Sequence, residues 1–93
     1  MIKSYKSKQL QKVSQGDLSK IPPQFAKIIQ AILNALDTAT CINDFDLPGK
    51  RLHPYKNKIP KTWSLDVSGN YRITFEWNEE EENAYNVDYL DPH

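Results

Sequence analysis

Two histidines, an arginine and an aspartate in the second half of the chain carry side chains suited to acid–base and phosphate chemistry: His53, Arg72, Asp91 and His93. Imidazole titrates near neutral pH, so both histidines, together with Asp91, can take part in proton transfer. Arginine binds a phosphate through two parallel hydrogen bonds. Breaking an RNA chain by attack of the ribose 2′-OH needs a base, an acid for the leaving 5′ oxygen, and a cation near the phosphate. These residue types are therefore suited to metal-free cleavage of RNA.

A basic stretch covers residues 50–61. It contains five lysines and arginines and no acid, and all twelve basic residues of the chain lie at or before Arg72. Seven acids and no base follow from Glu76 onward, although the formal net charge is zero. Such a split favours an anionic partner on the basic side, or it reflects two solvated surfaces without a partner. On the first interpretation Lys56 also helps to hold the phosphate, and Tyr55 stacks on a base. The four candidate RNA-binding residues are Tyr55, Lys56, Lys58 and Lys61.

Each catalytic candidate also has a plain structural interpretation. Arg72 can pair across a hairpin with Asp66, a surface contact that contributes little free energy. His53 precedes a proline and can be an ordinary loop residue. His93 is the last residue of the sequence, and terminal residues usually fray. The residue types alone leave catalytic and structural roles open.

Three segments predict the sheet that positions these residues: 63–67, 71–77 and 85–89. In each segment the odd-numbered positions are apolar and the even-numbered positions are polar, which indicates strands with one buried face. A hairpin between the first two strands puts Asp66 opposite Arg72. The third strand then carries the end of the chain back towards Arg72, so that an arginine, two acids and a terminal histidine meet at one edge of the sheet.

The first half of the chain predicts two helices, which cover the apolar face of the sheet. A short helix spans residues 7–14. The main helix opens at Pro22-Pro23, where proline is tolerated in a first turn, and fades at residues 38–40. A short edge strand is predicted at 51–55, and residues 2–5 can add another. The main helix has an apolar stripe of helical spacing formed by Phe25, Ile28, Ile29, Ile32, Leu33 and Leu36.

Length and composition predict a single domain that spans residues 1–93. Cys41 is the single cysteine, so an intrachain disulfide is excluded and a reducing compartment is expected. No apolar run approaches the ~20 residues of a membrane span, and no signal peptide is recognisable. The ligand spacings of zinc sites, a glycine-rich phosphate loop and a serine nucleophile elbow are also absent from the sequence. We therefore expect a cytoplasmic protein that uses no metal or other cofactor and binds no membrane.

Several segments along nearly the whole chain carry a family resemblance: Met1-Ile2-Lys3-Ser4, residues 36–40, Arg51-Leu52-His53-Pro54, Trp63-Ser64, residues 68–75, and Val87-Asp88-Tyr89 before a terminal histidine. With these segments together the chain resembles the HigB-type toxins of the RelE/ParE superfamily, which are bacterial endoribonucleases of toxin–antitoxin pairs. The resemblance implies an α+β, RelE-like fold, with two N-terminal helices packed on a mostly antiparallel four- to five-stranded sheet. It also implies cleavage of mRNA on the ribosome and inhibition by a helix-turn-helix antitoxin protein.

The resemblance extends to the active site and departs from the family pattern at one residue. Pro92 stands where such toxins usually have the tyrosine of an Asp-Tyr-His ending. The family tyrosine is thought to contact the nucleotide, and proline supplies neither a hydroxyl nor an aromatic ring. Proline also restricts the preceding Asp91 to extended conformations. Family active-site positions match His53, Lys56, Arg72, Asp91 and His93.

Three functions stay open for this sequence. We favour a ribosome-dependent mRNA endoribonuclease that uses 2′-OH attack and leaves a 2′,3′-cyclic phosphate and a 5′-OH. The paired His53 and His93 favour it, because a protein that only binds gyrase has no need of imidazoles. The second is a toxin that inhibits DNA gyrase and cleaves nothing, as other members of the superfamily do. The third is a weakened toxin that mainly binds its antitoxin, which the substitution at Pro92 favours.

Overall fold

The computed structural model describes residues 1–45, 49, 51–55 and 61–90 of the chain. The helices precede the sheet in the sequence, as predicted. The helical elements are α1 (Lys8–Ser14), the 3₁₀ turn η1 (Pro23–Phe25), α2 (Ala26–Thr38) and the 3₁₀ turn η2 (Ile42–Phe45). The strands are β1 (His53–Pro54), β2 (Thr62–Asp66), β3 (Arg72–Asn78) and β4 (Asn83–Leu90).

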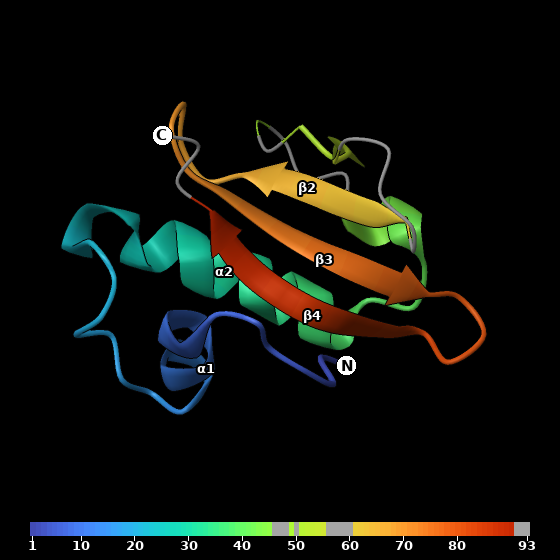
Figure 1. The fold of residues 1–93 in the computed structure, drawn as a ribbon, viewed down its shortest axis with the longest axis horizontal. Coiled ribbons are helices and arrows are strands. Elements are labelled where there is room, and N and C mark those ends of the chain that lie inside the picture. The colour runs from blue at the N-terminus through green and yellow to red at the C-terminus, as the bar shows by residue number, and fades with distance from the viewer. Residues whose placement is uncertain (46–48, 50, 56–60, 91–93) are drawn as a thin grey trace.

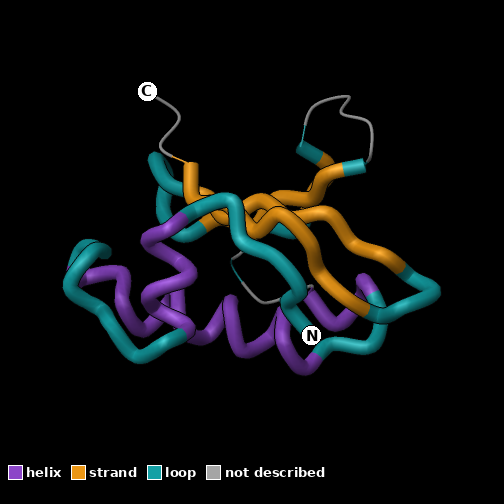
Figure 2. Tube along the Cα trace, turned by 60° about the horizontal axis from the view of Figure 1, so that its bottom comes forward, coloured by secondary structure: helices purple, strands orange, loops and turns teal. Residues whose placement is uncertain are grey.

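The strands form one antiparallel sheet in the order β1-β2-β3-β4. Figure 1 shows α2 running behind this sheet and α1 lying beside β4. Figure 2 shows the same layers from another side, with the strands above the helices. We call the face that packs on the helices the inner face, and the opposite one the outer face. The predicted α+β arrangement, helices on an antiparallel sheet, is confirmed for the residues that the structure describes.

The helix ends follow from local sequence, with one difference from the prediction. Ser7 caps α1, because its Oγ accepts a hydrogen bond from the backbone N of Leu10 at 3.2 Å. The main helix begins later than predicted, since Pro23 opens a 3₁₀ turn and α-helical geometry starts at Ala26. Its apolar stripe packs on the sheet as predicted, and its buried residues are Ile29, Ile32, Leu33 and Leu36.

The inner face of the sheet supplies the other half of the core. Leu65, Ile73 and Phe75 are each fully buried, at 0% exposure. Phe45 from η2 packs edge-on against Phe75 and against Trp77, with ring centroids 5.0 Å apart in both pairs. Full burial of a large apolar side chain contributes about 1.5–3 kcal/mol. The same burial maintains the strand register, because a slip of one residue would turn these side chains outward.

The predicted alternation is wrong at Tyr85. β4 has one residue more than β3 between the pairs on either side of a β-bulge. Asn86 lies in the bulge with a φ of 53°, a left-handed conformation that asparagine tolerates better than most residues. The extra residue puts Tyr85 opposite Glu76 on the outer face, and Ala84 is buried on the inner face at 0% exposure. A pattern of period two cannot reveal a residue that breaks the period.

The N-terminal segment runs along β4 and stabilises this bulge. Ile2 and Tyr5 each form an isolated parallel bridge with β4. The Oγ of Ser4 accepts a hydrogen bond from the backbone N of Asn86 at 2.8 Å. The additional strand predicted at residues 2–5 is therefore a pair of bridges rather than a regular strand.

We expect the left-handed backbone at Asn86 to limit what this position tolerates. Asn86→Val should lower the free energy of unfolding by about 1–3 kcal/mol, because a β-branched side chain is strained at positive φ. Asn86→Gly is the matched control, since glycine accepts positive φ, and it should lose less than about 1 kcal/mol. Urea unfolding of both variants measures the difference. Equal losses would show that backbone strain at the bulge is unimportant.

Candidate active site

The outer face of the sheet brings together residues from all four strands. Residues paired across antiparallel strands point to the same face, so the Cα pairs define rows of neighbouring side chains. Adjacent rows on one face are about 7 Å apart and adjacent strands about 4.8 Å apart, which long side chains can span. One row consists of His53, Ser64, Thr74 and Asp88, and the next consists of Asp66, Arg72 and Leu90.

Arg72 opens β3 with part of its guanidinium enclosed by the protein. Its Nε is buried and has no hydrogen-bond partner among the residues that the structure describes. Asp66 lies opposite Arg72, as the hairpin predicted. The carboxylate nevertheless contacts a different arginine, because Asp66 Oδ2 lies 3.5 Å from Nε of Arg51. The structural interpretation of Arg72 as the ion-pair partner of Asp66 is therefore wrong.

His53 lies in β1 and is half-buried. Its Nδ1 contacts the carbonyl oxygen of Arg51. A carbonyl oxygen only accepts hydrogen bonds, so Nδ1 must carry the proton. The neutral ring then keeps its lone pair on Nε2, the atom that can accept a proton from a substrate. His53 thus lies in a short strand and not in a loop, and a main-chain carbonyl contacts its ring.

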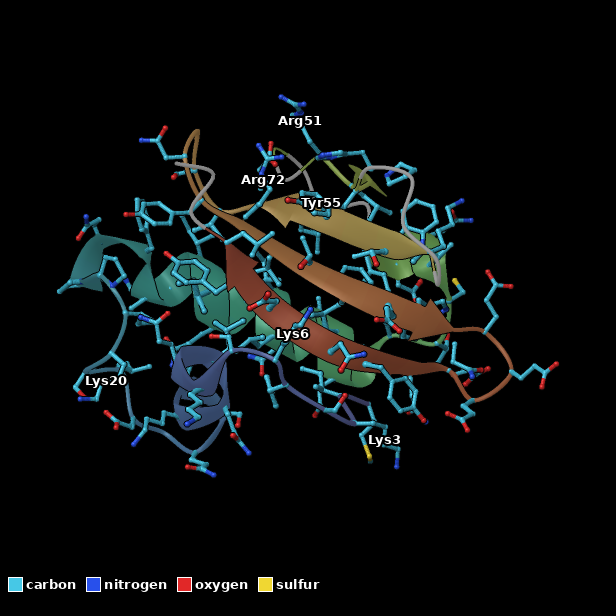
Figure 3. The ribbon with its side chains drawn as sticks, in the orientation of Figure 1. Lys3, Lys6, Lys20, Arg51, Tyr55 and Arg72 are labelled. Carbon is cyan, nitrogen blue, oxygen red and sulfur yellow. The ribbon has the colours of Figure 1, made fainter. Side chains whose placement is uncertain are left out.

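Tyr55 extends the same surface. It follows β1, and its backbone N donates to the carbonyl oxygen of Thr62 at 2.7 Å. Because it lies two residues after His53 in extended chain, its side chain is on the same face. Figure 3 shows Tyr55 over β2, on the same side of the molecule as Arg51 and Arg72. The described residues thus place a histidine, an arginine and an aromatic ring on one face of the sheet, with Tyr55 beside Thr62 and Arg72 at the opposite end of the β2–β3 ladder.

Lys61 lies apart from His53 and Arg72. It precedes β2 at the end of the strand remote from Asp66. Its Nζ is 4.4 Å from the ring centroid of Trp63, a residue that packs against the hydrophobic core. This cation–π contact keeps the exposed charge near the indole ring. The predicted role of Lys61 in RNA binding therefore belongs to a different part of the surface from His53 and Arg72.

Four of the predicted site residues lie outside the described residues: Lys56, Lys58, Asp91 and His93. The direction of β4 bears on the last two. Its last described residue, Leu90, pairs with Arg72. The expectation that the third strand runs towards Arg72 is therefore confirmed as far as Leu90.

Sequence reasoning did not single out Arg51, Ser64 or Asp88 as site residues. Ser64 and Asp88 share the row of His53, and Ser64 is fully buried at 0% exposure. Arg51 contacts both the ring of His53 and the carboxylate of Asp66. The polar alternation places Ser64 and Asp88 on the outer face, and Arg51 stood out only as part of the basic stretch and of the family segment Arg51-Leu52-His53-Pro54.

Among the described residues, no three His, Cys, Asp or Glu side chains are grouped so that they could hold a metal ion. The hydroxyl of Tyr85 donates a hydrogen bond to Glu81, and this hydrogen bond raises the pKa of the Tyr85 phenol above its ordinary value.

Within the described ranges, no helix is both long enough and apolar enough to cross a bilayer.

Comparison with known proteins identifies the family. A family model described as RelE-like toxin of type II toxin-antitoxin system HigB matches residues 3–93. The chain belongs to this family. The HigB-like toxin is 38% identical over 94 residues to a protein of Proteus vulgaris named Endoribonuclease HigB, and the match covers all of both chains. The predicted resemblance to HigB-type toxins is confirmed, and membership of a type II family implies an antitoxin partner.

The buried hydroxyl of Ser64 allows a stability prediction for this HigB-like toxin. Ser64→Ala should leave the free energy of unfolding unchanged or raise it by up to about 1 kcal/mol, because it removes a buried Oγ that has no hydrogen-bond partner in the described structure. Ser64→Val adds volume at the same place and should cost about 1–3 kcal/mol. Urea unfolding measures both changes. A clear loss of stability in Ser64→Ala would mean that the hydroxyl is hydrogen-bonded in solution.

Proposed function

We propose that this HigB-like toxin is an mRNA endoribonuclease that acts on the ribosome and cleaves by 2′-OH attack. The observation that carries the proposal is the shared outer face: His53, the candidate base, lies in the row next to that of Arg72, the candidate phosphate ligand, two strands away. Tyr55 lies on the same face (Figure 3), where its ring can stack on a base of the RNA. The name of the Proteus vulgaris relative, an endoribonuclease, supports the same reaction class.

The proposed reaction uses proton transfer and charge stabilisation. His53 accepts the proton of the 2′-OH at Nε2 while the 2′ oxygen attacks phosphorus. The bond from phosphorus to the 5′ oxygen breaks, and that oxygen takes up a proton, which leaves a 2′,3′-cyclic phosphate and a 5′-OH. Arg72 donates two hydrogen bonds to the phosphate oxygens as their charge grows. We assign the acid to His93 and Asp91, and a second phosphate contact to Lys56, on the family resemblance of these positions.

We further propose that the basic stretch binds ribosomal RNA through Lys56, Lys58 and Lys61. These lysines are supported by their residue type and by the absence of acids from residues 50–61 of the sequence. A surface that neutralises phosphates loses affinity as salt rises, so this contact should depend on ionic strength. The antitoxin is proposed to be a helix-turn-helix protein, as the family resemblance implies, and the sequence of the neighbouring gene would identify it.

Arg72→Ala should abolish growth arrest and mRNA cleavage without unfolding the protein. Loss of a charge-assisted phosphate contact costs about 2–4 kcal/mol in the transition state, or roughly 30- to 1,000-fold in rate. Primer extension on a reporter mRNA, after each variant is induced in cells, measures cleavage. Lys20→Ala is the control, because it also removes one positive charge but lies on another part of the molecule from Arg72 (Figure 3). Full activity in a stably expressed Arg72→Ala variant would contradict the proposed phosphate contact.

Deletion of His93 separates the enzyme from a binding protein. If His93 supplies a proton, its deletion should remove mRNA cleavage while antitoxin binding persists, because the core and the sheet are untouched. Pro92→Tyr should preserve or raise cleavage by restoring a ring that stacks on a base, a gain of roughly 1–3 kcal/mol at most. Equal cleavage with and without His93 would exclude its imidazole from the mechanism. Growth arrest with a DNA-damage response and no cleavage by the parent chain would instead identify a gyrase inhibitor.

A further inference from the structure

Arg51 has an unusual backbone and two contacts with the candidate site. Its φ is 51°, in the left-handed region, where a long side chain is uncommon. Its carbonyl oxygen contacts Nδ1 of His53, and its side chain contacts the carboxylate of Asp66. Strained backbone of this kind persists only where surrounding contacts require it, and it is frequent at functional sites. Arg51 therefore contacts both His53, the candidate base, and Asp66, which lies directly opposite Arg72, the candidate phosphate ligand.

The side chain of Arg51 competes with Arg72 for one carboxylate. Asp66 and Arg72 are directly opposite each other in the β2–β3 ladder, where oppositely charged side chains normally pair. The described contact is between Asp66 and Arg51 instead, at 3.5 Å, and Nε of Arg72 has no partner among the described residues. A carboxylate bound to Arg72 would repel a phosphate and occupy its hydrogen-bond donors. With the Asp66 carboxylate on Arg51, that carboxylate does not occupy the hydrogen-bond donors of Arg72.

Stability does not account for this ion pair. The side chain of Arg51 is 76% exposed and that of Asp66 is 19% exposed. Ion pairs so open to water contribute little to folding. Arg51 therefore contributes little to the stability of the fold. Its contacts with His53 and Asp66 better explain its strained backbone.

The main-chain carbonyl of Arg51 acts on His53, the candidate base. Its carbonyl oxygen can only accept a hydrogen bond, so it selects the tautomer of His53 with the proton on Nδ1. Nε2 is then the basic nitrogen. A partner at one ring nitrogen commonly determines which nitrogen of a histidine is available for chemistry.

We propose that Arg51 is a positioning residue of the active site. Its side chain holds the Asp66 carboxylate away from Arg72, and its carbonyl oxygen orients His53 with Nε2 towards the substrate. The inference rests on the proposed function, because it requires that Arg72 binds the phosphate and that His53 transfers a proton.

A double-mutant cycle tests the side-chain part. Arg51→Gly removes the side chain and accepts the positive φ, so it should fold as the parent does and lower kcat/KM for mRNA on programmed ribosomes three- to tenfold. Asp66→Asn removes the competing charge and should not lower the rate. The variant with both changes should return to the rate of Asp66→Asn, which a merely structural role of Arg51 would not produce. Arg51→Lys retains the cation and should retain most of the activity.

The possible outcomes separate this inference from the proposed function. Parent-like cleavage by Arg51→Gly, in an assay where Arg72→Ala is inactive, would overturn the inference and leave the proposed function standing. A double variant that stays as slow as Arg51→Gly would also overturn it. Full activity of Arg72→Ala would overturn the proposed function itself.

The backbone part has a spectroscopic test on the parent chain. Nitrogen-15 NMR of the His53 ring, at a pH where the ring is neutral, should show the tautomer with the proton on Nδ1. A ring protonated on Nε2 would overturn this part. The same spectrum of Arg51→Gly should be unchanged, since that variant keeps the carbonyl oxygen and the positive φ.

Discussion

The pairing of β2 with β3 is the constraint on which both faces of the sheet depend. Its register sets Leu65 opposite Ile73 on the inner face and Asp66 opposite Arg72 on the outer face. A slip by one residue would exchange the two faces, so that the guanidinium entered the core and apolar side chains met water. The free energy of apolar burial therefore determines the position of Arg72, although Arg72 contributes little to that burial.

The residues that stabilise the fold and the candidate site residues lie in different parts of the structure. The helices and the inner face of the sheet supply the buried apolar residues, with Phe45 joining the two layers. The described candidate site residues come from the outer face and from the segment that enters β1. A rigid scaffold with functional groups on its exposed surface lets those groups vary without loss of the fold.

Period-two alternation was sufficient to predict the β2–β3 hairpin and the strand register in which Asp66 lies opposite Arg72. Both depend on neighbouring residues in the chain. Helical spacing likewise predicted the buried side of α2. Tyr85 was predicted wrongly, since its orientation depends on a bulge at Asn86 that is held by Ser4, a residue 82 positions away in the sequence. Local patterns carry no information about such distant contacts.

The sequence could not predict the contacts of Arg51 either. One carboxylate can bind either of two arginines, and the choice depends on the left-handed backbone of Arg51, which no neighbouring residue type indicates. Burial of Ser64 was missed because the alternation tells which face a residue takes and not what covers that face. The roles of Asp91 and His93 stay predictions, since both lie outside the described residues.

In the part of the chain that the structure describes, both edges of the sheet offer few free main-chain groups to a further strand. The residues from Ile2 to Ser7 lie along β4 and donate and accept main-chain hydrogen bonds there. At the opposite edge β1 is two residues long in the described structure, and its second residue is Pro54, which has no N–H to donate. Strands as apolar on one face as β2 and β3 would associate readily with a second sheet if an edge were open. The N-terminal segment therefore has a second consequence besides its hydrogen bond to the bulge: it occupies main-chain groups of β4 that would otherwise be free to pair with another strand.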